Sequence, residues 1–493
     1  MSFALPVELK PGTTSLLTRN HLPAQTAHTI ALSKAMRLLC LIVCALITSR
    51  AVAAMPNILF VVSDDQRPDT IHALGNAVIE TPNLDRLVAC GTAFSRAYAG
   101  YPICHVSRAQ MLTGTHAFKA LPKYPGGAID PKLATLAGTL QAAGYHTCFT
   151  GKWHNDGHPT QRGYTITSGL YSSGGGKGAT ERTTDERGHA ITGYRGWTFK
   201  DEHDKPDLDK GVGLLPDNSR HVADGAIRAI TSAPKDKPWF VHVNFAFPHD
   251  PRQWPEGMKN RYDPAKMPLP ANFSPQHPFD HGNLDGRDEL LLPTPRNEAA
   301  VREELALYYA MITDLDTQLG RILAALPSFD DTVIIFTSDQ GLALGSHGLL
   351  GKQNEYEHSI RSPLIVCGPG LPKNQRSTAL VALHDLFPTL CDLSGIAIPD
   401  TVTGKTLAPL IKHQTNRVHE FVTGMFTDTQ RMICDDRWKL VLYPQAGREQ
   451  LFDLQTDPDE RHDLSGDASQ KATRDALRAK LNDWRERNHD PLR

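Results

Sequence analysis

The stretch Asn57–Ser63 (NILFVVS), followed directly by Asp64 and Asp65, decides the fold expected for this chain. Its unbroken apolar run, mostly β-branched or aromatic, predicts a strand buried on both faces of a parallel sheet. The run ends abruptly in two carboxylates. Because open α/β sheets bind ligands beyond the carboxyl ends of their strands, Asp64 and Asp65 are candidates for a functional site.

The same pattern recurs along the chain. Further strands are predicted at 145–150, 239–247, 332–337 and 363–367, and helices at 133–143 and 298–326, where apolar residues recur every three or four positions. This alternation predicts an α/β fold with a large, mostly parallel sheet sandwiched by helices. From residue 396 a strand at 438–443 and a terminal helix carrying Leu477, Leu481 and Trp484 on one face predict a smaller C-terminal α+β domain with a short antiparallel sheet.

The beginning of the chain predicts export. Residues 36–54 (MRLLCLIVCALITSRAVAA) combine a positive start, an apolar core and a small-residue cleavage pattern, as in a secretory signal peptide. We expect 1–35 to be a non-native extension before a true start at Met36, 55–395 to be the catalytic α/β domain, and 396–493 to be the C-terminal subdomain. The alternatives are an uncleaved anchor or a lipid attached to Cys44. Export implies a periplasmic or secreted protein without a stable membrane span after signal removal.

Composition narrows the class of protein. The chain has 493 residues, with 52 Lys and Arg against 54 Asp and Glu, which argues against a basic nucleic-acid binder. Its 40% hydrophobic content excludes a disordered chain. The 8 Cys are too few for a disulfide scaffold of this length, and Cys148 and Cys367 lie in predicted strands, where buried thiols are expected. Gly, Pro, Asp and His dominate 156–220 and 250–297, which we expect to be loops that line a substrate cleft.

Polar side chains gather just after the predicted strands, which indicates one site assembled from distant segments. These side chains are Asp64, Asp65, Lys152, His154, His249, Asp339 and Gln340. Carboxylates brought together repel unless a cation neutralises them, and all-oxygen ligation suits Ca²⁺ or Mg²⁺ better than zinc. An isolated Asp-Asp pair more often caps a turn. The second pair at another strand end, Asp339 and Gln340, favours a metal site.

A second constellation lies at 101–114 (YPICHVSRAQMLTG). The segment indicates a helix beginning near Ser107, so Cys104 would lie at the positive end of that helix, where anions bind well. Arg108 would then clamp a tetrahedral oxyanion. The simpler interpretation of a lone cysteine is a small buried hydrophobe.

The segment around Cys104 resembles the activation motif of the type I sulfatases, C-x-P-x-R followed by L-T-G, in the alkaline phosphatase superfamily. Further sulfatase motifs follow in order over about 56–490: TPNLD at 81–85, GKWH at 151–154, PH at 248–249, SDQG at 338–341, GSHG and GK before residue 353, and LFDLQTDPDE at 451–460. Two positions depart from the pattern. Val106 stands where the maturation motif has Pro or Ala, and Gln340 stands where relatives carry Asn or His.

The resemblance implies a role for each candidate residue. Cys104 would be oxidised to formylglycine by a formylglycine-generating enzyme, and its hydrated aldehyde would attack sulfur. One Ca²⁺ would be held by Asp64, Asp65, the residue at 104, Asp339 and Gln340. The catalytic set would be Cys104, Arg108, Lys152, His154, His249 and Lys352. In this set the cations neutralise the sulfuryl group, His249 protonates the leaving oxygen and His154 orients or deprotonates the diol. His347 is a weaker candidate for contact with the substrate.

Three functions are therefore weighed. The first is an exported sulfatase that hydrolyses an O-sulfate ester of a small molecule or glycan. The second is a phosphodiesterase or phosphonate monoester hydrolase of the same superfamily. The third, prompted by Val106, is an unconverted protein that binds anions or glycans without catalysis.

Overall fold

The structure is a computed structural model that describes residues 55–123, 126–174 and 182–492. The predicted extension and signal peptide, with Cys44, lie outside the described residues. β1 (Asn57–Ser63) has the predicted bounds and lies between two parallel neighbours, β6 (Trp239–Asn244) and β7 (Thr332–Ser338). Ile58 and Phe60 enter the core on one face of the sheet, and Leu59 and Val61 enter the core on the other. β1 is thus buried on both faces, as its sequence predicted.

The large sheet has ten strands and is mostly parallel. Its order is β10 (Val381–Ala382), β2 (Thr92–Tyr98), β8 (Arg361–Cys367), β7, β1, β6, β3 (His146–Lys152), β4 (Ile166–Ser172) and β5 (Thr198–Phe199), with β9 (Gln375–Ser377) beside β2. β8 runs antiparallel to both of its neighbours. The segment that joins β7 to β8 contains only the short helix α8 (Glu357–Ile360) and turns the chain back along β7.

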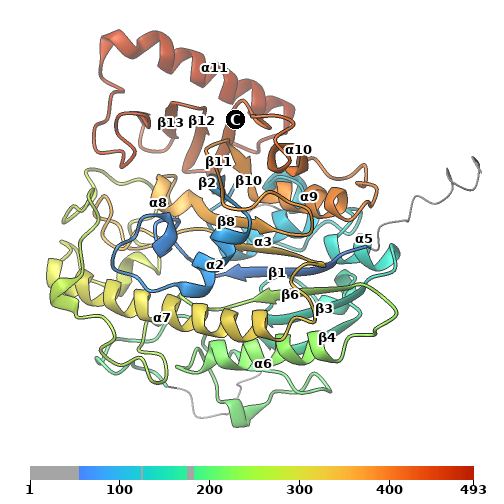
Figure 1. The fold of residues 1–493 in the computed structure, drawn as a ribbon. Coiled ribbons are helices and arrows are strands. Elements are labelled where there is room, and N and C mark those ends of the chain that lie inside the picture. The colour runs from blue at the N-terminus through green and yellow to red at the C-terminus, as the bar shows by residue number, and fades with distance from the viewer. Residues whose placement is uncertain (1–54, 124–125, 175–181, 493) are drawn as a thin grey trace, which may run out of the picture. The chain divides into compact units, whose positions relative to one another are not determined.

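Helices cover both faces of this sheet (Figure 1). One face carries α2 (Pro82–Cys90), α6 (Asn218–Thr231) and α7 (Glu298–Ala324). The other carries α3 (Cys104–Thr113), α4 (Ala117–Ala120), α5 (Leu136–Ala142), α9 (Leu386–Leu393) and α10 (Ala408–Ile411). The predicted sandwich is confirmed.

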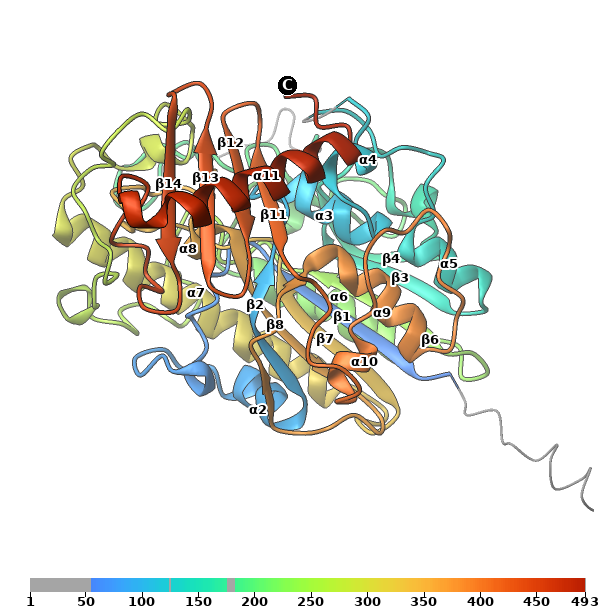
Figure 2. The same ribbon diagram turned by 90° about the horizontal axis from the view of Figure 1, so that it is seen from above.

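A second, antiparallel sheet follows, of strands β11 (Val422–Phe426), β12 (Gln430–Cys434), β13 (Trp438–Tyr443) and β14 (Arg448–Asp453). The terminal helix α11 (Lys471–Arg487) crosses one face of it, as Figure 2 shows, and packs there through Leu477 and Leu481. The opposite face packs against Tyr98 of β2, in the large sheet, and against Ile360 of α8. The C-terminal antiparallel sheet is as predicted, and the domain boundary at 395/396 stays a prediction.

Several predicted element ends shift by a few residues. The helix expected at 133–143 begins at Leu136, because the Thr135 side chain accepts from the Gly138 N–H and caps it there. The helix expected at 298–326 ends at Ala324, and the strand expected at 239–247 ends at Asn244. The described cysteines are free thiols, with Cys148 and Cys367 buried in strands as expected. Within the described part of the chain, no helix has the length and apolar character needed to cross a membrane.

Candidate active site

The carboxyl ends of three strands, β7, β1 and β3, build the site. Asp64 directly follows β1, Asp339 directly follows β7, and Lys152 is the last residue of β3. Ser63 and Ser338 are register partners, so the two acidic pairs leave the sheet side by side. Before Lys152, only a glycine fits, because a Cβ on Gly151 would lie 2.0 Å from the Asn244 carbonyl oxygen.

Three buried carboxylates and one thiol converge at these ends. Ligand atoms of Asp64, Asp65, Cys104 and Asp339 all lie within 4.8 Å of one another, and each residue is at most 2% exposed. Asp65 has a φ of 68°, in the left-handed region that non-glycine residues rarely adopt. Its N–H donates to Asp339 Oδ1 at 3.0 Å, and Tyr308 donates to its carbonyl oxygen at 2.6 Å. These contacts hold a strained turn, which is a common feature of functional sites.

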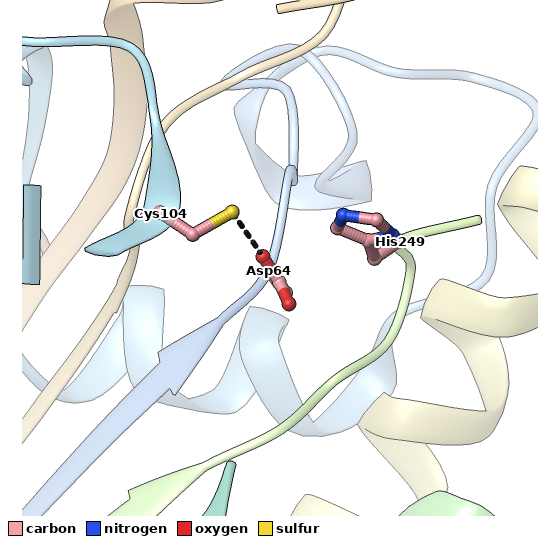
Figure 3. Close-up of side chains that lie close together, drawn as sticks. All are labelled: Asp64, Cys104 and His249. Carbon is pink, nitrogen blue, oxygen red and sulfur yellow. Dashed lines mark hydrogen bonds between the residues drawn. The ribbon is translucent and has the colours of Figure 1, made fainter. Parts of the chain in front are cut away.

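Helix α3 presents the thiol. Cys104 is its first residue, three positions earlier than the sequence predicted, and Cys104 Sγ lies 3.2 Å from Asp64 Oδ1. Figure 3 shows the Cys104 side chain pointing at Asp64, with the His249 ring on the other side of that carboxylate. Ser107 donates to the Asp339 carbonyl oxygen at 2.6 Å and so fastens α3 to the end of β7. Burial, followed by the charge of Asp64, raises the pKa of the Cys104 thiol well above its ordinary value.

Each carboxylate has a cationic partner. Arg108 donates from Nε to Asp339 Oδ2 at 2.9 Å. Lys152 Nζ contacts the Asp64 carboxylate. Lys352 Nζ lies 2.8 Å from Asp65 Oδ2 and 3.6 Å from an oxygen of Asp288. The site therefore alternates buried positive and negative charges.

The electrostatic balance differs among the three carboxylates. Burial alone would raise the pKa of Asp64, but Lys152 and His249 hold it well below its ordinary value. The pKa of Asp65 is raised to about 7, because burial outweighs Lys352 and the neighbouring carboxylates repel its charge. The pKa of Asp339 is raised for the same reasons despite Arg108.

The donor set fits a hard cation. Gln340 Nε2 donates to Asp65 Oδ1 at 2.6 Å and to Cys104 Sγ at 3.2 Å, while its Oε1 is buried and has no hydrogen-bond partner. A half-turn of the terminal amide would exchange these atoms and bring the unpartnered oxygen beside Asp65. Three carboxylates and an amide oxygen are the ligands that calcium prefers. The glutamine at position 340 can thus serve as a ligand to a hard cation.

Two histidines face the same place from different elements. His249 Nδ1 lies 2.7 Å from the Asp250 carbonyl oxygen and 3.1 Å from Asp250 Oδ1, so it donates there and leaves Nε2 toward the site, 3.7 Å from Asp65 Oδ2. Burial, with Lys352, lowers the pKa of His249 to about 4. His154 packs edge-on against Trp197, and burial followed by Lys152 lowers the pKa of His154 well below its ordinary value.

A cavity of about 250 Å³ opens above these groups. Five of the six predicted catalytic residues line it, whereas Arg108 is not among the lining residues and donates to Asp339 instead. His347 is not among the lining side chains, and its ring stacks on Tyr356 at 4.0 Å between centroids.

Sequence reasoning missed several residues of this cavity: Thr192, Gly193, Tyr194, Trp197, Arg287, Asp288 and Gln353. Among them Tyr194 contacts the candidate metal ligands directly, because its hydroxyl donates to the Asp64 carboxylate. Most of the missed residues come from the two irregular segments, 156–220 and 250–297, that were expected to line a cleft. That compositional signal located the loops but not the individual side chains.

Comparisons with known proteins agree with this geometry. A family model for sulfatases matches residues 56–396, and a second one, for the C-terminal region of N-sulphoglucosamine sulphohydrolase, matches 345–487. An arylsulfatase of Clostridium perfringens is 30% identical over 456 residues, covering 86% of this chain and 93% of that protein. Human arylsulfatase K is 27% identical, covering 83% of this chain and 79% of that protein.

Solved structures extend the likeness. A phosphonate monoester hydrolase of Agrobacterium radiobacter superposes with a TM-score of 0.71 at 25% identity, covering 88% of this chain and 96% of that one. A protein solved with its substrate D-glucosamine-2-N,6-O-disulfate also gives 0.71, at 22% identity, covering 88% of this chain and 98% of that one. At that identity the second likeness concerns the fold alone.

Proposed function

The chain belongs to the sulfatase family, whose members are sulfuric ester hydrolases, and on that premise we propose that it hydrolyses an O-sulfate ester of a sulfated small molecule or carbohydrate, using calcium and a formylglycine formed from Cys104. One observation carries the proposal. Cys104 Sγ stands 3.2 Å from Asp64 at the start of α3, inside a ring of buried carboxylates and cations and at the floor of a cavity.

Calcium would be held by Asp64, Asp65, Asp339, Gln340 and the residue at position 104. The support is the convergence of their ligand atoms and the unpartnered Gln340 oxygen. A bound calcium ion would supply positive charge beside the transferring sulfuryl group.

The formylglycine at position 104 would supply, as its hydrate, the oxygen nucleophile of the family's reaction. A formylglycine-generating enzyme would have to act before folding, because Cys104 is 2% exposed in the folded chain. Val106, in the first turn of α3, is fully buried and stands where the maturation motif usually has Pro or Ala.

The remaining residues bind the anion and move protons. Lys152 and Lys352 line the cavity and would turn part of their charge toward the sulfate oxygens, while Arg108 holds Asp339 in place beneath them. His249 would act at Nε2, the ring nitrogen that faces the site. Because Nδ1 already carries the proton directed at Asp250, Nε2 can donate to the departing alcohol oxygen only from the imidazolium form, which the negative charge of a bound sulfate ester would favour. His154, which also lines the cavity, would orient the nucleophilic hydroxyl.

The test compares matched aryl esters. We expect kcat/KM for 4-nitrophenyl sulfate to exceed that for 4-nitrophenyl phosphate, with inorganic sulfate released in equal amount to the phenol. A preference for the phosphate by orders of magnitude would contradict the proposal. A control protein with Cys104→Ala reports any contaminating esterase.

A second candidate is a phosphonate monoester hydrolase or phosphodiesterase. The observation that favours it is the likeness to the Agrobacterium radiobacter enzyme, whose identity of 25% is as high as that of any solved neighbour described above. Adding a phenyl phosphonate monoester and a phosphodiester to the same assay separates the two functions.

We also propose that the protein is exported to the periplasm or secreted, as residues 36–54 predict. N-terminal sequencing of protein from the native host would find a start near Met55, after cleavage. A start at Met1 or Met36 would contradict signal removal.

A further inference from the structure

A second cavity of about 280 Å³ adjoins the reaction cavity. The two share Thr192 and Arg287 in their walls and so lie side by side, as subsites for adjacent units of one ligand would. The residues that line it lie outside the sulfatase-like motifs, and two of them, Asp250 and Pro251, directly follow the PH motif at 248–249. Its walls come from the loop that precedes β5, the loop after β6 and helix α7.

Charges in this second cavity are sorted by depth. The side chains of Arg287 and Arg187 are 36% and 20% exposed, whereas those of Asp250 and Glu304 are 5% and 4% exposed. A third carboxylate, Asp185, pairs with Arg187 and is 7% exposed, so three acidic groups balance the three arginines of the lining. The carboxylates nevertheless lie deeper than Arg287 and Arg187, and these two guanidinium groups are the charges nearest the opening. An anionic group is the complement of these two charges.

The buried carboxylates hold the guanidinium groups in place. Asp250 accepts from both terminal nitrogens of Arg287, at 2.6 and 2.9 Å. Glu304 accepts from Arg187 at 2.5 Å and also from Arg252 Nε. Guanidinium groups fixed in advance lose little conformational freedom when a ligand binds.

Donors remain for a ligand. Arg252 lines the cavity and is 4% exposed, and within the described part of the chain its side chain donates a hydrogen bond from Nε alone. Its two terminal nitrogens thus keep their N–H groups. A planar pair of N–H groups matches a carboxylate or a sulfate.

We propose that this second cavity is a subsite for an acidic group, a carboxylate or a second sulfate, on the sugar unit next to the one that carries the scissile ester. The inference rests on the proposed function and makes it narrower, because it assigns acidic sulfated oligosaccharides as the preferred substrates. Leu290, 69% exposed at the rim of the cavity, gives a position where charge can be changed without disturbing the core.

The test uses two O-sulfated disaccharides that differ only in the neighbouring unit, a uronic acid in one and a neutral hexose in the other. The wild-type protein should give a higher kcat/KM for the acidic disaccharide. Leu290→Asp should lower the ratio of the two values by about fivefold, and Leu290→Lys should raise it, because one charge is added near the bound anion. Arg252→Gln should lower the ratio by about tenfold or more.

Ile398→Asp is the matched control, because Ile398 is 41% exposed and lines neither cavity. Its ratio should equal that of the wild type. Equal ratios in the wild type and both Leu290 variants would overturn the subsite while leaving the sulfatase proposal intact. Failure to release sulfate from any ester would instead contradict the proposed function.

Binding decides the subsite even in an inactive preparation. Calorimetry with the two desulfated disaccharides needs no turnover, and we expect tighter binding of the uronic acid compound, weakened in Leu290→Asp and strengthened in Leu290→Lys. Equal affinities for both compounds, unaffected by the substitutions, would overturn the inference.

Discussion

Replacing Asp339 by Asn should separate the metal from the fold. The Asp339 carboxylate accepts from Arg108 at 2.9 Å and from the backbone N–H groups of Asp65 and Gln340, each at 3.0 Å. Asparagine keeps the shape but removes the charge and turns one acceptor into a donor. Removing one partner of a buried, hydrogen-bonded charge pair lowers the free energy of unfolding by roughly 3–5 kcal/mol.

A bound cation would lose a similar amount of binding free energy, since one of the three clustered carboxylate charges disappears. At about 1.4 kcal/mol for each factor of ten, a loss of roughly 3–4 kcal/mol weakens calcium binding by about 10²–10³-fold. Titration calorimetry on chelator-treated protein measures this directly, and the rise in Tm with added calcium gives a second readout.

The matched control is Asp314→Asn. Asp314 is a buried aspartate of α7 that accepts from Gln318 at 3.2 Å and belongs to no part of the candidate site. We expect it to bind calcium like the wild type even if its Tm falls. If Asp339→Asn bound calcium within threefold of the wild type, the metal assignment would be refuted.

Three further substitutions test other parts of the account. Val106→Pro should increase the fraction of protein converted at position 104, as measured in intact-mass spectra. Because proline is tolerated in the first turn of a helix, the free energy of unfolding should change by no more than about 1 kcal/mol. An unchanged fraction would show that Val106 does not limit maturation. Tyr194→Phe, which removes a hydrogen bond to the buried Asp64, should lower kcat/KM for an aryl sulfate by about tenfold or more, and an unchanged value would exclude a role for this hydroxyl. Burial raises the pKa of Asp490, but Arg431 holds that pKa below its ordinary value, so the ion pair stabilises the fold at neutral pH and this stabilisation is lost as the pH falls below about 3.9. Urea unfolding should show that Asp490→Asn lowers the free energy of unfolding by about 3 kcal/mol at pH 7 and by progressively less in acid. A difference independent of pH would contradict this.

The centre of the fold was predictable because local and global constraints agree there. β1 is apolar on both faces, so its bounds and its burial follow from composition alone. Its end in Asp64 and the end of β7 in Asp339 then had to meet, since adjacent parallel strands bring their carboxyl ends to one edge. The antiparallel course of β8 was not predictable, because an apolar run does not reveal the direction of its strand.

The loop residues of the site could not be predicted from the sequence, for a different reason. Tyr194 and Arg287 reach the cavity through the long-range packing of irregular segments, and neither segment has a periodicity that fixes where a side chain points. His347 illustrates the reverse error. It lies near the Lys352 motif in the chain, yet its ring packs on Tyr356 and not in the cavity.

The central claim, that a converted Cys104 performs the hydrolysis, is tested most directly by mass spectrometry of the peptide that carries residue 104. Protein from the native host, shown to release sulfate from an aryl sulfate, should carry at this position an aldehyde in place of the thiol. A preparation with full sulfatase activity and only unmodified thiol at Cys104 would contradict the account. Thiol alone in protein that binds sulfated ligands without hydrolysing them would contradict it as well, and would favour a binding protein.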